Sequence, residues 1–396
     1  MSLRDDVEAL AALDRRSASA GERISAAWCA DRLRQAGATD VQLQPFRYQH
    51  SFGHAHALHF AAATLGRVPA ALALAGFELD YSGRAQPLRR LLPKGEGANV
   101  VGRIPAALPP ESAQSAGAGD AGPTAANMPP KSARREADVR TLVLVAHHDA
   151  AHTGLMWDPR LAEGGARADG RLPFSLLPEL AMAAMALGPR RLRWPARAVL
   201  ALATGLALQV ARGETVPGAS DNATGVAAVL ALVERLAADP LPGVDVIAVL
   251  TGAEESGMGG MAAWMEAEGG RLDPATTLVL GLDTLGAGEP MVVTAEGPVW
   301  GVAYGDREIA LADSAAASAG LPAPRHFRLG GWTDPVLARL AGLPTISLLS
   351  LKENAFTDYH LPTDTPDRVD WASVDACLAL AAAVVGEWSS LLSGRT

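Results

Sequence analysis

The sequence predicts an α/β fold of three layers, with helices on both faces of a mixed, largely parallel central sheet. Two observations predict it. First, the chain contains several unbroken apolar runs of the kind found in strands that are buried on both faces. Second, segments of helical character lie between these runs, and such alternation indicates an α/β fold. The apolar runs are residues 141–146, 244–251, 277–282 and 344–349.

The remaining elements follow from their local patterns. Val7, Leu10 and Leu13 stand at helical spacing, and a second helix is expected over about 22–35. Shorter strands are expected at 40–47 and 98–105. Ligands of such folds gather at the carboxyl ends of the strands, so polar residues there are the first candidates for a site. Further helices are expected at about 222–238, 258–268, 305–320, 335–341 and 370–392.

Composition narrows the class of protein. The chain has 396 residues, of which 49% are hydrophobic, so residues 1–396 can form a single domain with a large core. The net charge is −9 and the basic residues are scattered, which argues against a nucleic-acid partner. Cys29 and Cys377 are the only cysteines, which excludes a disulfide framework. The amino terminus lacks the apolar core of a signal peptide, so we expect a cytoplasmic protein.

Several segments do not fit the alternation. Residues 105–139 are rich in Ala, Pro, Gly and Ser, which predicts a disordered loop. Residues 157–212 are expected to form an inserted apolar helical cap or hairpin. The apolar segments 57–76 and 173–211 are too short or too interrupted by Pro and Arg to predict membrane spans. We favour a lid, a buried cap or a homo-oligomer contact, and leave open association with a membrane surface through the arginine-rich connector "PRRLRWP".

The stretch "VAHHD" ends one of the buried strands. Side chains alternate along a strand, so His147 and Asp149 project to one side and His148 to the other. A histidine that binds zinc commonly donates its other ring N–H to a carboxylate, and Asp149 stands where it can accept that bond. His147 is therefore a candidate ligand and Asp149 its orienting partner.

Other acidic and imidazole groups follow the remaining strands. Asp221 is expected in a loop at a helix start. It is either the N-cap of that helix or a carboxylate that two cations share. Glu254 and Glu255 are adjacent acids whose charges repel each other. Either a solvated turn or a bound cation would compensate this repulsion. Asp283 follows an apolar run, and His360 comes from a loop near the carboxyl terminus. Mixed histidine and carboxylate ligands suit zinc, and a pair of metals activates water for hydrolysis.

The order of these motifs carries a resemblance. H-x-D, D-N-x-x-G-V, A-E-E-x-G, L-D-x-x-G and Y-H-x-x-x-D-T follow one another as in the zinc aminopeptidases of the bacterial leucyl aminopeptidase and aminopeptidase Y type. That family also includes glutamate carboxypeptidases and glutaminyl cyclases. The chain resembles it over residues 5–46, 97–149 and 218–392. The resemblance implies a zinc exopeptidase fold and two Zn²⁺ ions.

The resemblance also assigns roles to residues. His147 and Asp283 would hold one zinc ion, Glu255 and His360 the other, and Asp221 would bridge them. The Asp221–Asn222 peptide bond would be cis.

Catalytic and substrate-binding roles come from the same comparison. Glu254 would be the general base, Asp149 would orient His147, and Tyr359 would donate a hydrogen bond to the oxyanion. Trp332 and Thr333 would contact substrate.

This chain departs from the family pattern in two places. Pro335 stands where the family often has a histidine. His147 and Asp221 are also 221 − 147 = 74 residues apart, which is far more than the short loop that usually joins these motifs.

We therefore predict a di-zinc metallo-exopeptidase, a hydrolase that cleaves the N-terminal bond of a peptide or small amide. The alternatives are a glutaminyl cyclase-like or carboxypeptidase/deacylase activity at the same site, and a non-catalytic membrane-associated scaffold. The remaining histidines are expected in solvated positions. For His50, His54, His56 and His59 we favour a solvated loop and helix start over an accessory metal site, and for His152 and His326 a surface loop over contact with substrate.

Overall fold

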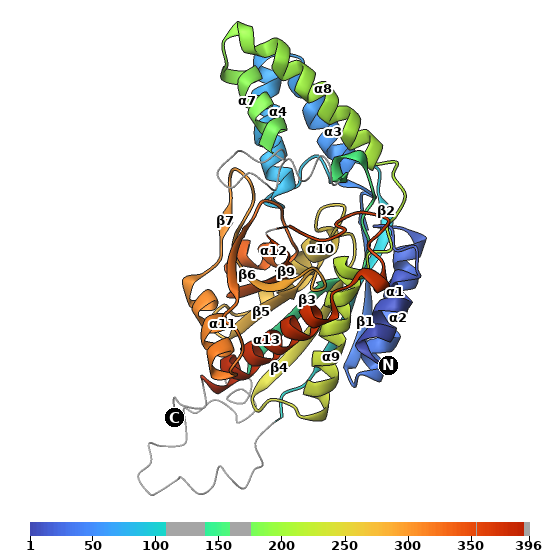
Figure 1. The fold of residues 1–396 in the computed structure, drawn as a ribbon, viewed down its shortest axis with the longest axis vertical. Coiled ribbons are helices and arrows are strands. Elements are labelled where there is room, and N and C mark those ends of the chain that lie inside the picture. Colours follow the sequence, from blue (N-terminus) through green and yellow to red (C-terminus); the bar gives the residue numbers. More distant parts are fainter. Residues whose placement is uncertain (108–138, 159–175, 354, 392–396) are drawn as a thin grey trace, which may run out of the picture.

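The computed structural model describes residues 1–107, 139–158, 176–353 and 355–391. Most of the predicted loop 105–139 and part of the predicted insertion 157–212 lie outside these ranges. The described residues form a mixed sheet in the order β1-β2-β4-β3-β5-β9-β6-β7, with β8 paired to β6 (Figure 1). Strands β4, β3, β5 and β9 are mutually parallel, whereas β2 and β6 run antiparallel to their neighbours in this group.

The predicted strands all form. Along β3 the side chains alternate between the two faces, because Leu142 and Leu144 join one apolar core and Val143 and Val145 join the other. The strands are β1 (Thr39–Tyr48), β2 (Gly95–Ile104), β3 (Arg140–His147), β4 (Val244–Thr251), β5 (Thr277–Leu282), β6 (Glu289–Glu296), β7 (Val302–Ala303), β8 (Arg325–Leu329) and β9 (Thr345–Leu351). The sequence did not predict β6, β7 and β8, which are short or interrupted by polar residues.

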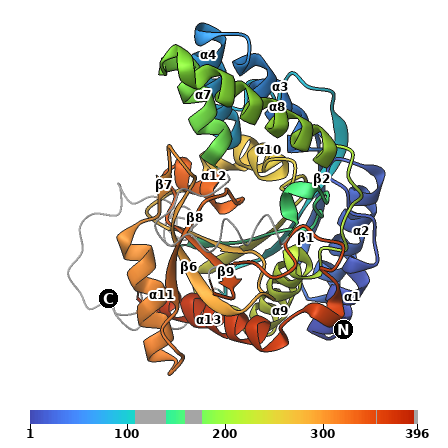
Figure 2. The same cartoon turned by 45° about the horizontal axis from the view of Figure 1, so that its top comes forward.

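Helices cover both faces of this sheet. One layer shares the larger core and comprises α1 (Leu3–Ala11), α2 (Ala20–Gln35), α9 (Thr224–Ala238), α11 (Asp306–Ser318) and α13 (Trp371–Ser390). The other layer comprises α10 (Gly259–Glu268) and α12 (Pro335–Leu340), which pack on the opposite face (Figure 2). The three-layer α/β fold expected from the sequence is therefore present.

A group of four helices, which we call the cap, projects beyond the sheet (Figures 1 and 2). It contains α3 (Phe52–Ala63), α4 (Arg67–Tyr81), α7 (Leu177–Leu187) and α8 (Arg193–Val210). These helices share a separate apolar core that includes Phe60, Phe77, Met182 and Leu200. Two segments that are far apart in the chain thus bury their apolar faces against each other.

Two of the expected solvated histidines lie inside the cap. His56 and His59 belong to α3 and are only 7% and 8% exposed. His56 packs its ring against Phe77 and Tyr81, and His59 Nε2 lies 2.7 Å from Asp80 Oδ2. The expectation of a solvated loop was wrong for this pair because α4, remote in sequence, covers α3.

Among the described residues, α13 alone is long and apolar enough to cross a membrane by length and composition. Its buried residues, including Val374, Cys377 and Val384, belong to the core beside the sheet. The packing of α13 is therefore that of a core helix.

Candidate metal centre

Asp149 connects the end of β3 to the paired glutamates. Its Oδ1 lies 3.4 Å from His147 Nδ1 and accepts the backbone N–H of Glu254 at 3.1 Å. Its Oδ2 accepts the backbone N–H of Glu255 at 3.2 Å and the hydroxyl of Ser17 at 2.6 Å. Asp149 is fully buried, so one carboxylate fixes the turn after β4 and also faces the histidine ring.

His148 points to the other side of β3, as the alternation predicts. Its Nε2 lies 2.9 Å from the carbonyl oxygen of Ala98, and its Nδ1 lies 3.1 Å from the hydroxyl of Ser25. Burial lowers the pKa of His148 to about 4, which keeps the ring neutral. His148 is therefore a packed structural residue, which binds β3 to β2 and α2.

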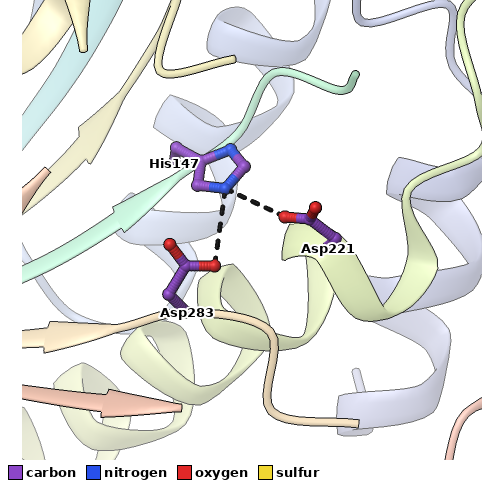
Figure 3. A group of neighbouring side chains, drawn as sticks. All are labelled: His147, Asp221 and Asp283. Carbon is purple, nitrogen blue, oxygen red and sulfur yellow. Dashed lines mark ion pairs between the residues drawn. The ribbon is translucent and has the colours of Figure 1, made fainter. Parts of the chain in front are cut away.

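Asp221 lies between two groups of ligand atoms. Its Oδ1 is 3.2 Å from His147 Nε2, and its Oδ2 is 3.2 Å from His360 Nε2. Asp283 Oδ1 lies 3.7 Å from the same nitrogen of His147, and Glu255 Oε2 lies 3.1 Å from His360 Nε2. Figure 3 shows the carboxylates of Asp221 and Asp283 on either side of the His147 ring nitrogen that they share. Each oxygen of one carboxylate thus faces a different histidine.

Three triads of donor atoms result. In each triad, one donor atom from each residue lies within 4.8 Å of the others. Two triads share Asp221: the first comprises His147, Asp221 and Asp283, and the second Asp221, Glu255 and His360. The third comprises His147, Glu254 and Glu255. The two triads that share Asp221 contain the five ligands that the sequence predicts, brought together by β3, β5 and three loops. Mixed imidazole and carboxylate donors are a set that zinc takes.

The charge balance fits a cation as well. Glu255 Oε1 is buried and has no hydrogen-bond partner. Burial raises the pKa of Glu255 to about 7, and burial together with the charges of Asp334 and Glu255 raises the pKa of Glu254 well above its usual range. A bound divalent cation would compensate the repulsion between these buried carboxylates.

The loop that carries Asp221 is fixed from two directions. The Asp221–Asn222 peptide bond is cis, as the resemblance implies. The amide of Asn222 donates to the carbonyl oxygen of Leu282 at 3.0 Å and accepts the backbone N–H of Thr284 at 3.1 Å. These two bonds clamp both neighbours of Asp283, so the central carboxylate and the ligand at the end of β5 keep one geometry.

Sequence reasoning missed two residues behind this loop. Asp364 accepts the backbone N–H groups of Ser220 at 2.7 Å and Asp221 at 3.1 Å. Asp364 is the aspartate of the Y-H-x-x-x-D-T motif, so a signal was present but no role was assigned to it. Arg15 donates from one guanidinium nitrogen to the carbonyl oxygens of Pro217 and Gly218 at 2.6 and 2.7 Å, and nothing in its local sequence marked it.

A pocket opens beside the triads. Trp332 and Thr333, which are expected to contact substrate, line it together with apolar Leu329, Leu349 and Phe356. Glu296, which the sequence analysis did not single out, supports this wall from the side away from the pocket. Buried Glu296 accepts the backbone N–H of Thr333 at 2.7 Å and its hydroxyl at 2.6 Å.

Pro335 does not belong to the pocket lining. It is the first residue of α12 and is buried, and a Cβ added to Gly281 would meet its Cγ at 1.9 Å. The preceding residue, Asp334, is also buried and accepts a hydrogen bond from the hydroxyl of Thr251. This segment therefore packs on β5 and β4.

An aromatic group lies on the far side of the site. The Tyr359 ring stacks on the His360 ring at a centroid distance of 3.8 Å, and Trp157 approaches His360 edge-on at 4.5 Å. Burial and the nearby charges of Asp221 and Glu255 raise the pKa of Tyr359 well above its usual range, so its phenol stays protonated and can donate. Trp157, at the start of the insertion, was not singled out by the sequence.

His152 is buried, at 7% exposure, and not in a surface loop as expected. The bridge between His152 and Thr215 draws the two ends of the inserted segment together. His326 is exposed and lies 3.0 Å from Asp313, as a surface residue should be.

Comparison with known proteins agrees with the motifs. Residues 202–385, which carry four of the five candidate ligands, match the model of peptidase family M28. No curated protein matches the sequence.

Solved structures share the fold along the chain. A zinc aminopeptidase from Bacillus subtilis is 14% identical with a TM-score of 0.56, and the match covers 98% of this chain and 94% of that one. An aminopeptidase from Aneurinibacillus sp. strain AM-1 is 13% identical with a TM-score of 0.55, covering 97% and 92%. A glutaminyl cyclase from Bacteroides thetaiotaomicron is 13% identical with a TM-score of 0.54, covering 97% and 96%. Residues 202–385 of this chain therefore resemble peptidase family M28, in agreement with the zinc peptidases that its motifs resemble.

Proposed function

We propose that this zinc-dependent peptidase is a di-zinc aminopeptidase that hydrolyses the N-terminal peptide bond of peptides. The observation that carries the proposal is the position of Asp221, whose two oxygens each lie 3.2 Å from a different histidine. A carboxylate so placed can bridge two cations. The aminopeptidases of B. subtilis and Aneurinibacillus, which share the fold, support the same reading.

The two triads that share Asp221 provide the ligands. His147 and Asp283 would hold one zinc ion, Glu255 and His360 the other, and Asp221 both. When bound, zinc polarises the scissile carbonyl and lowers the pKa of a coordinated water to about 7. Asp149 would hold the imidazole of His147 through Nδ1, which leaves Nε2 free to ligate.

Glu254 moves the proton in this proposal. It lines the pocket and forms a third group of close donor atoms with His147 and Glu255, but it shares no group with Asp221. Glu254 accepts a proton from the attacking water and then delivers it to the amine that leaves. The protonated phenol of Tyr359 donates to the carbonyl oxygen as negative charge develops there.

The pocket lining disfavours a substrate with a free terminal carboxylate. Among the described residues, the lining contains neither Lys nor Arg. A carboxypeptidase needs a cation to bind the terminal carboxylate of its substrate, so this lining fits an aminopeptidase better. Trp332, Leu349 and the other apolar wall residues would accept an apolar first side chain.

The two-domain carboxypeptidase and deacylase alternative requires a separate domain before the last histidine. Residues between Asp283 and His360 form β6 to β9 with α11 and α12, all of them part of the central α/β unit. The described residues between Asp283 and His360 therefore contain no separate domain. The glutaminyl cyclase alternative is supported by the B. thetaiotaomicron structure and differs in metal content.

Metal analysis combined with an aminoacyl amide panel tests the proposal. We expect about two zinc ions per chain and hydrolysis of amides of apolar amino acids. Glu254→Gln should keep both ions and lose about 100-fold to 10,000-fold in kcat, because the proton acceptor is gone. Glu266→Gln, which changes an exposed glutamate of α10, is the matched control and should behave as wild type.

The other outcomes are distinct. One zinc ion per chain with cyclisation of N-terminal glutamine would establish the cyclase alternative. Protein without zinc, or full activity in Glu254→Gln, would overturn the proposal and favour a non-catalytic scaffold.

A further inference from the structure

The two turns at the far end of the cap form one surface, at the top of the molecule in Figure 1. One turn joins α3 to α4 and the other joins α7 to α8. Arg67 donates to the carbonyl oxygen of Gly188 at 3.3 Å, and Arg197 donates to that of Thr64 at 3.1 Å. We call this surface, residues 64–68 and 187–197, the cap tip.

The cap tip exposes large apolar side chains. Leu65 is 76% exposed, Val68 69%, Leu187 83% and Trp194 77%. They come from both turns, which two hydrogen bonds hold together. Single exposed apolar residues are common, but a group of four including a tryptophan marks a contact surface. No described residue covers them.

The same surface is strongly basic. It carries five arginines, Arg67, Arg190, Arg191, Arg193 and Arg197, all exposed except the half-buried Arg193. The sequence has no Asp or Glu within 41–77 or 180–213, although the whole chain has a net charge of −9. Positive charge is therefore concentrated at the cap tip, where no acidic residue of these two segments offsets it.

We propose that the cap tip docks on an anionic phospholipid bilayer. Arginine binds lipid phosphate, tryptophan favours the headgroup region, and leucine and valine can insert just below it. A purely polyanionic partner would satisfy the arginines and leave the apolar residues in water. The combination of both features, with charge complementary to an acidic leaflet, selects the membrane.

The docking is peripheral. Helix α8 has 18 residues, which corresponds to a length of about 27 Å, and it runs from the cap tip toward the metal site. At its other end, Gln209 accepts the backbone N–H of Leu155, two residues before Trp157, which contacts His360. Lipid contact at the tip therefore leaves the catalytic pocket about one helix length away, in water.

Vesicle co-sedimentation of the full chain tests this inference. We expect binding to vesicles of phosphatidylcholine with 30% phosphatidylglycerol, about tenfold or more stronger than to pure phosphatidylcholine, and weaker at high salt. Arg190→Glu with Arg191→Glu should reduce the partition coefficient about 25-fold or more, since each removed arginine costs about fivefold. Leu187→Ala with Trp194→Ala should also weaken binding while the charge stays unchanged.

Matched controls lie on the catalytic unit. Arg307→Glu reverses an exposed charge on α11, and Leu43→Ala removes an exposed apolar side chain from β1. Both should bind vesicles as wild type does. Glu254→Gln should bind equally well, so failure of the proposed catalysis and failure of this inference are separate results. All variants are compared at matched thermal stability and zinc content.

Three results would overturn the inference. One is no binding to either vesicle, and another is equal binding by both double variants and wild type. The third is a dimer in light scattering that the double variants dissociate, without vesicle binding, which would assign the cap tip to a second copy of the chain.

Discussion

Asp149 accepts the backbone N–H of Glu254 at 3.1 Å while its other side faces the ring of His147. The candidate base and a candidate ligand are thus positioned by one buried carboxylate, although 105 residues separate Asp149 from Glu254. A change at this aspartate should affect metal affinity and proton transfer together.

Asp149→Asn tests this coupling. The amide oxygen keeps one acceptor, but the negative charge that favours His147 as a ligand is lost. We expect zinc affinity to fall about 10-fold to 100-fold and kcat to fall even when zinc is saturating. Chelator competition gives the affinity, and aminoacyl amide hydrolysis gives kcat. Unchanged affinity would show that Asp149 acts only on the turn after β4.

Arg15→Ala should destabilise the protein strongly. The buried guanidinium donates to carbonyl oxygens of His148, Pro217 and Gly218, so its loss removes a donor from each of them. The oxygens of His148 and Gly218 keep one other donor each, the hydroxyl of Ser25 and the backbone N–H of Ala223. We expect about 3 to 5 kcal/mol less free energy of unfolding in urea, with partial recovery in Arg15→Lys. Arg235→Ala, at an exposed position on α9, should change stability by less than about 0.5 kcal/mol.

Zinc removal should lower thermal stability. Zinc that binds the native state alone stabilises it by about 2.7 kcal/mol at a free concentration of 100 times the Kd. Chelation should therefore lower the Tm of wild type, and added zinc should restore it. Asp221→Ala removes the carboxylate that two of the triads share, and its Tm should respond weakly to either treatment. Equal responses would place the metal elsewhere.

Acid should weaken the cap through His56. Burial, helped by the charge of Arg89 and by His59, lowers the pKa of this ring to about 3, against the hydrogen bond to the carbonyl oxygen of Phe52. Between pH 6.5 and 3 the unfolded state binds a proton that the folded state does not. The contribution of the neutral His56 ring to the free energy of unfolding is therefore fully present well above pH 6.5. This contribution falls with decreasing pH, by about 2 kcal/mol at pH 5.

His56→Phe removes this titration and keeps an aromatic ring beside Phe77 and Tyr81. The difference in unfolding free energy between wild type and variant should grow as the pH falls from 7.5 to 5. A difference independent of pH would mean that His56 is accessible to protons in the folded state.

The sequence predicted the fold class and the main strands because parallel strands that are buried on both faces consist of continuous apolar runs. The same runs predicted where His147 and Asp283 would lie, since parallel strands end at one edge of the sheet. The edge strand β8, Arg325–Leu329, has polar residues at most positions and so carried no such signal. Its pairing with β6 depends on tertiary contacts that local patterns do not contain.

Residues that hold the site from behind were harder to predict. Asp364 and Arg15 bind backbone groups of the loop before and around Asp221, and such partners can come from any part of the chain. Glu296 and Asp334 are single acids in segments with no other sign of function, yet both are buried beside the pocket. Burial of His56 and His59 likewise depends on contact with α4, and the sequence of α3 alone does not predict that contact.

The divided origin of the cap also matters while the chain is being made. Helix α4 ends at Tyr81 and its partner α7 begins at Leu177, so 177 − 81 = 96 further positions must be synthesised before the pair can form. At about 5 to 20 residues per second, the apolar faces of α3 and α4 remain without their partner helices for roughly 5 to 20 s. During that interval the nascent chain presents an apolar hairpin to the ribosome surface, to chaperones and to its neighbours, and its yield in cells should depend on how well that hairpin is shielded.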